Sequence, residues 1–116
     1  MAQQIPLNTF KLIAKTLTTG SNLIYQESVN NVSSIILSSQ ITNVATASQQ
    51  VTVKIQKSGS GEQVTLLKLA TIPVNESLNP FAGKVVLEKN DALYYILTGA
   101  SGSLQTVLSV LENANE

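Results

Sequence analysis

Few side chains in this 116-residue sequence could carry out acid–base, nucleophilic or metal chemistry. His and Cys are absent, which removes the commonest general base, the thiol nucleophile and the preferred ligands of zinc. The acidic residues fall at predicted turns, at strand ends or at the terminus, where acids are typically solvated. They are Glu27, Glu62, Glu76, Glu88, Asp91, Glu112 and Glu116. We therefore expect a protein that is not an enzyme and that has no cofactor and no metal site.

Two motifs resemble binding loops, and a structural explanation is favoured for each. Glu88 and Asp91 flank one predicted turn and could share a cation, but calcium-binding loops gather more acids than this. Residues 58–61 read Ser-Gly-Ser-Gly, but they lack the Gly-Lys-Ser/Thr ending and the following helix of a phosphate-binding loop. The formal net charge is zero and Arg is absent, which argues against a nucleic-acid partner.

Aromatic side chains make up only 4% of the sequence. Adjacent residues of a strand point to opposite faces, so Tyr94 and Tyr95 place one phenol in the core and the other outside. We take Tyr95 as a candidate contact residue, and subunit contact is favoured over sugar stacking for the outward phenol.

The elements that would position these residues are β-strands. Residues 51–56, Val-Thr-Val-Lys-Ile-Gln, show the clearest alternation of apolar and polar side chains, which is typical of a half-buried strand. The length suits one domain, and we predict an all-β fold, a single antiparallel β-sandwich of jelly-roll or immunoglobulin-like type. The domain spans residues 9–116, preceded by an extended arm at 1–8. The predicted strands are 9–17, 22–26, 33–43, 51–56, 63–70, 84–88, 92–98 and 104–111.

Two further predictions concern the strands. A helix over 103–115 also fits the apolar spacing, but the β-branched residues there favour a strand. In the first strand Phe10, Leu12 and Ala14 are predicted to share one face, with Lys11 and Lys15 on the other. Ile13 interrupts the polar face, which indicates a strand that is covered partly on both sides. The residues predicted to be buried at strand centres are Leu37, Val53, Ile55, Leu66, Leu87, Leu97 and Leu108.

No segment has the pattern of a membrane span or a secretion signal. The first eight residues lack a basic region followed by an apolar one, and the longest apolar run, 93–97, is far shorter than the roughly 20 residues that cross a bilayer. We expect no membrane partner, and synthesis in a cytoplasm.

The order of strands and turns resembles that of small virion structural proteins of tailed bacteriophages. Residues 51–56, the Ser/Gly hairpin, 64–68 and 72–74 are similar to the central hairpin of that family and its exit. Residues 83–88, 91–93 and 108–112 are similar to its last strands, and 16–25 and 35–43 to its first half. The resemblance implies a non-enzymatic β-sandwich present in many copies on a virion, as a capsid decoration, neck or tail component.

Self-association is the expected mode of action, because a neutral, charge-poor chain has little to repel its own copies. The expected partners are other copies of the chain and other virion proteins. The candidate contacts are Ile5, Pro6 and Leu7 in the arm, Leu78 and Phe81 in the irregular connection over 72–83, and Tyr95. Phe81 could instead fold back and close its own core. The alternative function is a carbohydrate- or receptor-binding module of a phage fibre or tail.

Overall fold

The computed structural model describes residues 7–26, 32–59, 61–81, 83–88 and 90–114, and the regular elements in these ranges are all strands. No helix long and apolar enough to cross a membrane occurs within them. The C-terminal segment is a strand, as predicted. The strands are β1 (Leu7–Thr16), β2 (Gly20–Gln26), β3 (Val32–Asn43), β4 (Gln49–Gln56), β5 (Gln63–Ile72), β6 (Ser77–Leu78), β7 (Val85–Leu87), β8 (Ala92–Leu97) and β9 (Leu104–Ala114).

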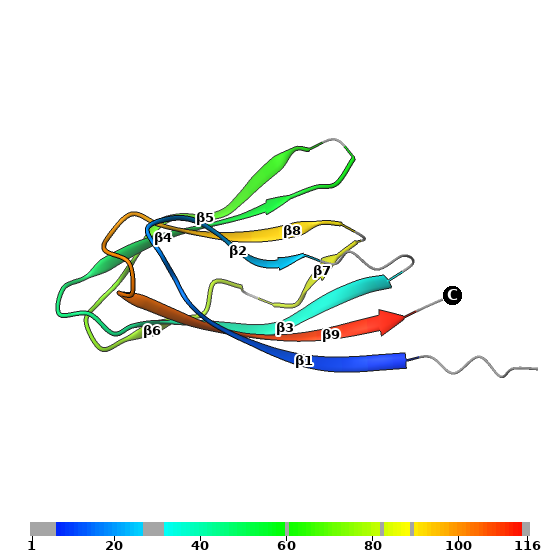
Figure 1. The fold of residues 1–116 in the computed structure, drawn as a ribbon, viewed down its shortest axis with the longest axis horizontal. Coiled ribbons are helices and arrows are strands. Elements are labelled where there is room, and N and C mark those ends of the chain that lie inside the picture. Colours follow the sequence, from blue (N-terminus) through cyan, green and yellow to red (C-terminus); the bar gives the residue numbers. More distant parts are fainter. Residues whose placement is uncertain (1–6, 27–31, 60, 82, 89, 115–116) are drawn as a thin grey trace, which may run out of the picture.

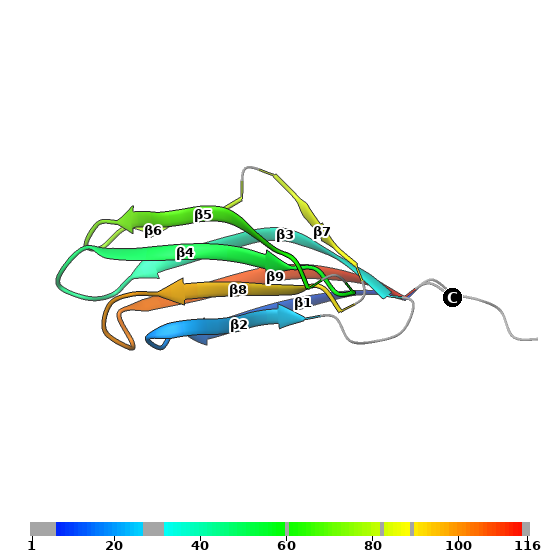
Figure 2. The ribbon, with the colours of Figure 1, turned by 90° about the horizontal axis from the view of Figure 1, so that it is seen from above.

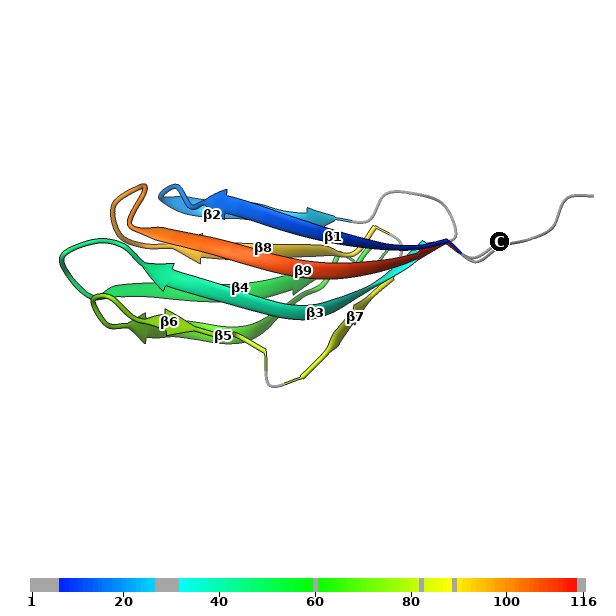
Figure 3. The ribbon, with the colours of Figure 1, turned by 90° about the horizontal axis from the view of Figure 1, so that it is seen from below.

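The strands form two antiparallel sheets packed face to face (Figure 1). Sheet A has the order β1-β9-β3-β6, with β7 pairing along another part of β3. Sheet B has the order β2-β8-β4-β5. Figure 2 shows the molecule from the side of sheet B, and Figure 3 from the side of sheet A. The predicted all-β sandwich is therefore confirmed.

The chain crosses from one sheet to the other at nearly every connection. Within the described ranges, the β4–β5 hairpin and the step from β6 to β7 are the exceptions, since each joins strands of the same sheet. This alternation is the jelly-roll arrangement rather than the immunoglobulin one. It makes β1 and β9, the first and last strands, neighbours with Leu7 opposite Ala114.

Apolar side chains from both sheets fill the space between them. Val53, Leu87, Leu97 and Leu108 are buried, as predicted, and Ile55 is partly buried against the same cluster. The other buried members of this core are Leu17, Ile24, Tyr25, Ile36, Ile41, Val51, Ile72, Phe81, Leu93, Tyr95, Leu104 and Val110.

A β-bulge at Leu37 changes which residues of β3 face the core. Ile36 lies opposite Val110 and Ser38 opposite Ser109, so two steps on β3 match one step on β9. The inward positions are even-numbered before the bulge and odd-numbered after it, as buried Ile36 and Ile41 show. Leu37 is therefore only partly buried, and its predicted full burial is wrong.

Two register shifts in the β4–β5 hairpin likewise keep Leu66 out of the core. Val53 pairs with Leu67 and Lys54 with Thr65, which leaves Leu66 without a partner on β4. Its side chain is 39% exposed, so its predicted burial is wrong. Figure 1 shows this hairpin rising away from the rest of sheet B, which leaves less core for β5 to cover.

Strand β1 turns the face that carries Ile13 toward the core, and the face that carries Phe10 and Leu12 is exposed. Phe10 and Leu12 are 72% and 70% exposed, whereas Ile13 packs against the core. Alternation places Lys11 and Lys15 on the Ile13 side, where Lys11 Nζ lies 3.1 Å from Glu112 Oε2 and Lys15 Nζ donates to the carbonyl of Leu23 at 3.0 Å. An edge strand can hold lysines on its inner face in this way, because their long stems reach the margin of the core.

Candidate assembly surfaces

The arm residues predicted as contacts lie largely outside the described ranges. Ile5 and Pro6 are not described. Leu7 belongs to β1, and its backbone pairs opposite Ala114 of β9. The first strand therefore begins two residues before the start at residue 9 that the sequence predicts.

The connection between β5 and β7 turns Leu78, Pro80 and Phe81 toward its own sandwich. Phe81 is 8% exposed and belongs to the core, Pro80 is buried, and Leu78 is partly buried against the core. Leu78 lies in β6, opposite Ile41 of β3. The Asn79 Oδ1 atom accepts a hydrogen bond from the Phe81 backbone N–H at 3.0 Å. The alternative in which Phe81 closes its own core is therefore the one the structure supports.

Tyr95 is a core residue, which corrects its assignment as a surface contact. Its side chain is fully buried, and its hydroxyl lies 2.6 Å from Ser39 Oγ on the opposite sheet. Burial raises the pKa of Tyr95 to about 12, against the opposing effect of hydrogen bonds with Ser39 and Thr106. Tyr94 is the outward phenol, and it lines a shallow hollow of about 350 Å³ on sheet B with Lys54, Gln56 and other residues.

Tyr25 makes a second polar link between the sheets. Its hydroxyl lies 2.7 Å from Ser34 Oγ and donates to Glu112 Oε2, and Lys11 reaches the same carboxylate oxygen. β2, β3, β9 and β1 are thereby joined by one chain of polar contacts. Such contacts fix the relative position of two sheets, because moving one leaves buried polar groups unpaired.

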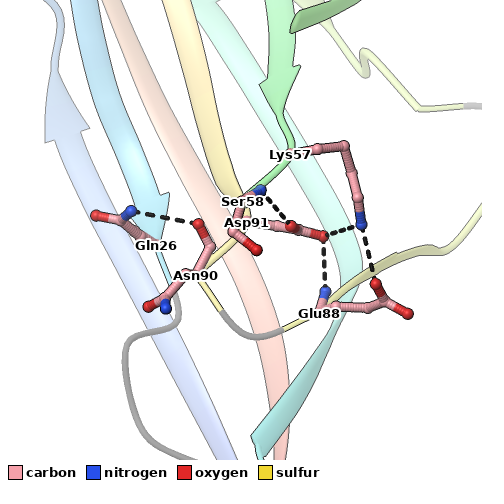
Figure 4. A network of polar contacts seen from close by, with 6 residues as sticks. All are labelled: Gln26, Lys57, Ser58, Glu88, Asn90 and Asp91. Carbon is pink, nitrogen blue, oxygen red and sulfur yellow. Dashed lines mark hydrogen bonds and ion pairs between the residues drawn. The ribbon is translucent and has the colours of Figure 1, made fainter. Parts of the chain in front are cut away.

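Asp91 organises the end of the sandwich where the β4–β5 hairpin meets the β7–β8 turn (Figure 4). Only 2% of its side chain is exposed. It accepts hydrogen bonds from Lys57 Nζ at 2.8 Å and from the backbone N–H groups of Ser58 and Glu88 at 3.1 and 3.0 Å. Burial by itself would raise the pKa of Asp91, but these bonds outweigh it and lower the pKa.

Lys57 is held at the same corner by two carboxylates. Its ammonium group contacts Glu88 Oε1 at 3.0 Å in addition to Asp91 (Figure 4). The hydrogen bonds to Asp91 and then Glu88 raise the pKa of Lys57. The described residues contain no group of three His, Cys, Asp or Glu side chains that could hold a metal ion. The hydrogen bonds and ion pairs of Asp91 and Lys57 make this turn a clamp between two loops.

The burial of several polar residues was not predicted from the sequence, because they occupy positions that resemble the outward positions of strands and turns. Asn22 accepts from Thr18 and donates to the carbonyl of Tyr95 at 3.1 Å. Asn43 donates to the carbonyls of Ala47 and Ile72, each at 2.9 Å. Local sequence patterns do not distinguish a polar residue that satisfies a turn from one that faces water.

Strands at the margins of the sheets are the surfaces most suited to assembly. β1 ends sheet A, and β2 and β5 end sheet B. A marginal strand presents backbone N–H and C=O groups that a further strand can pair with. Val64 and Leu69 on β5 are each 45% exposed, which adds apolar surface beside that backbone.

Comparison with known proteins identifies the fold and no family. No family model matches the sequence, and no curated protein matches it. Among solved structures, a chain described with Bacillus endospore appendages, a family of disulfide-linked pili, is similar at a TM-score of 0.58 and 12% identity, over 98% of this chain and 91% of that one. The Drosophila NLP-core, described with pentamer formation and histone binding, has a TM-score of 0.48 and 16% identity, over 88% of this chain and 97% of that one. The likeness to the appendage chain supports the sandwich fold.

Proposed function

We propose that this protein is a non-enzymatic structural subunit that self-associates to build a larger assembly. The observation that carries the proposal is the combination of a cross-linked sandwich with strands unpaired on one side at the margins of both sheets. Tyr25 and Tyr95 tie the two sheets together, so a subunit can transmit load without sliding of its layers. Neighbouring subunits can add their own strands at the free edges of β1, β2 and β5.

The particle we propose is the virion of a tailed bacteriophage, with the chain made in the cytoplasm of the bacterial host. The support is the resemblance of strand order and turns to small virion proteins. A surface appendage is the second candidate, and it is favoured by the fold likeness to a chain of the endospore pili. In either case the partners are further copies of this chain and the other proteins of the particle.

The contacts between subunits are non-covalent in this proposal. The similar appendage chain comes from pili described as disulfide-linked, whereas this sequence contains no Cys. Packing and hydrogen bonding must then supply all of the association energy. An assembly of this chain is expected to resist reducing agents and to dissociate in denaturants.

A glycan-binding module is less well supported by the positions of the aromatic residues. Tyr25, Tyr95 and Phe81 are buried. Phe10 is exposed on β1 of sheet A and Tyr94 lies on β8 of sheet B, so the two rings are on different sheets. Each ring could therefore act only as an isolated stacking platform, and Tyr94 is the one that lines a shallow hollow.

Analytical ultracentrifugation and negative-stain electron microscopy of the purified chain test the proposal. We expect an average mass that rises with concentration, and ordered multimers that are the same with and without reductant. A chain that stays monomeric at every concentration, alone and with the other proteins of its particle, would contradict self-association and assembly alike.

A further inference from the structure

The outward surface of sheet A is unusually apolar for a sheet that faces solvent. Cross-strand pairing places Phe10 opposite Leu111, Leu111 opposite Ile35, and Ile35 opposite Val86. These residues form a row across β1, β9, β3 and β7, and Figure 3 views the sheet from this side. Leu12 and Val107 lie on the same surface, because they share the alternation of Phe10 and Leu111. We call these six residues the sheet A face.

Exposure is concentrated on this face. Phe10, Leu12 and Val86 are 72%, 70% and 61% exposed, and these are the three most exposed large apolar side chains of the described residues. Val107 adds another at 43%. Single exposed apolar residues are ordinary, but a contiguous group marks a surface that another molecule covers.

The sheet A face also carries no charge. The outward positions of β1, β9, β3 and β7 in the described ranges are apolar or bear hydroxyl or amide groups. Lys11 and Lys15 would be the natural charges of the marginal strand, but they point inward to Glu112 and to the carbonyl of Leu23. Lys84 and Glu88 are exposed just outside β7, where an interface has its polar rim.

From this we infer that the sheet A face docks against the same face of a second copy of this chain. A charge-free surface offers nothing that an acidic or basic partner would select, and it desolvates at low cost. It is also compatible with itself, which a two-fold symmetric contact requires. Two such sheets would stack about 10 Å apart, as the two sheets of a sandwich do.

The size of the face suits a subunit contact. Strands about 4.8 Å apart, about 3.3 Å per residue along ten residues, give a flat area of roughly 500 Å² for the three long strands. Stable interfaces bury about 800 Å² of accessible surface per partner, and the accessible surface of a patch exceeds its flat area because side chains project from it. The inference rests on the proposed self-association and names the surface that performs it.

Charge substitutions at two ends of the face test the inference. Leu12→Lys and Val86→Lys each place two like charges in the symmetric contact, and we expect each to weaken association about tenfold or more. Ile96→Lys is the control, because Ile96 is partly exposed on β8, an inner strand of sheet B, and shares the outward side of Tyr94. Sedimentation equilibrium measures the association, and circular dichroism with thermal unfolding confirms that each variant folds.

The outcomes separate this inference from the proposed function. Weakened association in Leu12→Lys and Val86→Lys, with Ile96→Lys unchanged, supports the sheet A face. If the unmodified chain associates and both variants match it, the face is not the contact and self-association stands through other surfaces. Equal weakening in all three variants, Ile96→Lys included, would overturn the inference as a general effect of charge. A monomeric unmodified chain would overturn the inference and the proposed function together.

Discussion

At the scale of single residues, buried polar side chains do more to define this molecule than any reactive group. Asp91, Tyr95 and Tyr25 each satisfy partners on separate elements. Their hydrogen bonds hold loops and sheets together. Their removal should therefore be measurable as lost stability.

Replacement of Asp91 by Asn should destabilise the fold by about 1–3 kcal/mol, because one amide cannot accept all three hydrogen bonds and its NH₂ group opposes the donors. Glu88→Gln is the control, since the Glu88 side chain is 76% exposed, and it should cost less than about 1 kcal/mol. Urea unfolding at neutral pH measures both. Equal costs would show that the clamp does not depend on Asp91.

The same carboxylate should make stability depend on pH. The pKa of Asp91 in the folded state is lowered, so the folded state binds fewer protons there than the unfolded chain. Its contribution is present above the unfolded pKa of about 3.9 and is lost as the pH falls through the folded pKa. Urea midpoints between neutral and acidic pH should fall further for the unmodified protein than for Asp91→Asn.

Tyr95→Phe removes the hydroxyl that pairs with Ser39 across the sheets. It should cost about 1–3 kcal/mol, because Ser39 is left buried without that partner. The pKa of Tyr95 is raised to about 12, so its stabilising effect is present below the unfolded pKa of about 10 and is lost as the pH rises toward 12. In a spectrophotometric titration, the phenol that ionises at the highest pH should be missing from Tyr95→Phe. An unchanged titration would contradict the assignment of that ionisation to Tyr95.

At the scale of elements, the sequence predicted the strands better than the faces they turn inward. Alternation at 51–56 is a local property, and β4 has the expected inward Val51 and Val53. The bulges at Leu37 and Leu66 depend on register with a neighbouring strand, and one extra residue reverses every position after it. The lysines of β1 can point inward because this strand lies at the margin of sheet A. The alternation of residues along the strand does not reveal that position. Of the candidate contacts, Tyr95 proves to be a core residue, and Phe81 folds back onto the core as its alternative described.

This difference between strands can be tested with two leucines. Leu108→Ala on β9 should cost about 2–5 kcal/mol, because the side chain is fully buried. Leu66→Ala on β5 should cost less than about 1 kcal/mol, since its side chain is partly in solvent already. Urea unfolding compares them directly, and similar costs for the two would mean that the facing of β5 is wrong.

At the scale of the whole molecule, the N-terminal segment provides a separate test of assembly. Leu7 already belongs to β1, so the informative truncation removes residues 1–6 and keeps the strand intact. We expect the shortened chain to unfold at the same urea concentration as the full chain and to join the particle less well. Normal incorporation, measured by sedimentation with particles, would show that the arm is dispensable.

The pairing of the first and last strands also gives the molecule a direction. Because Leu7 lies opposite Ala114, β1 begins and β9 ends at one pole of sheet A, and the turn from β8 to β9 lies at the other (Figure 1). A cargo joined directly before Leu7 or directly after Ala114 would leave the sheet beside the first pole. The opposite pole would stay clear, so a peptide inserted into the turn at residues 99–103 would be displayed away from whatever anchors the ends.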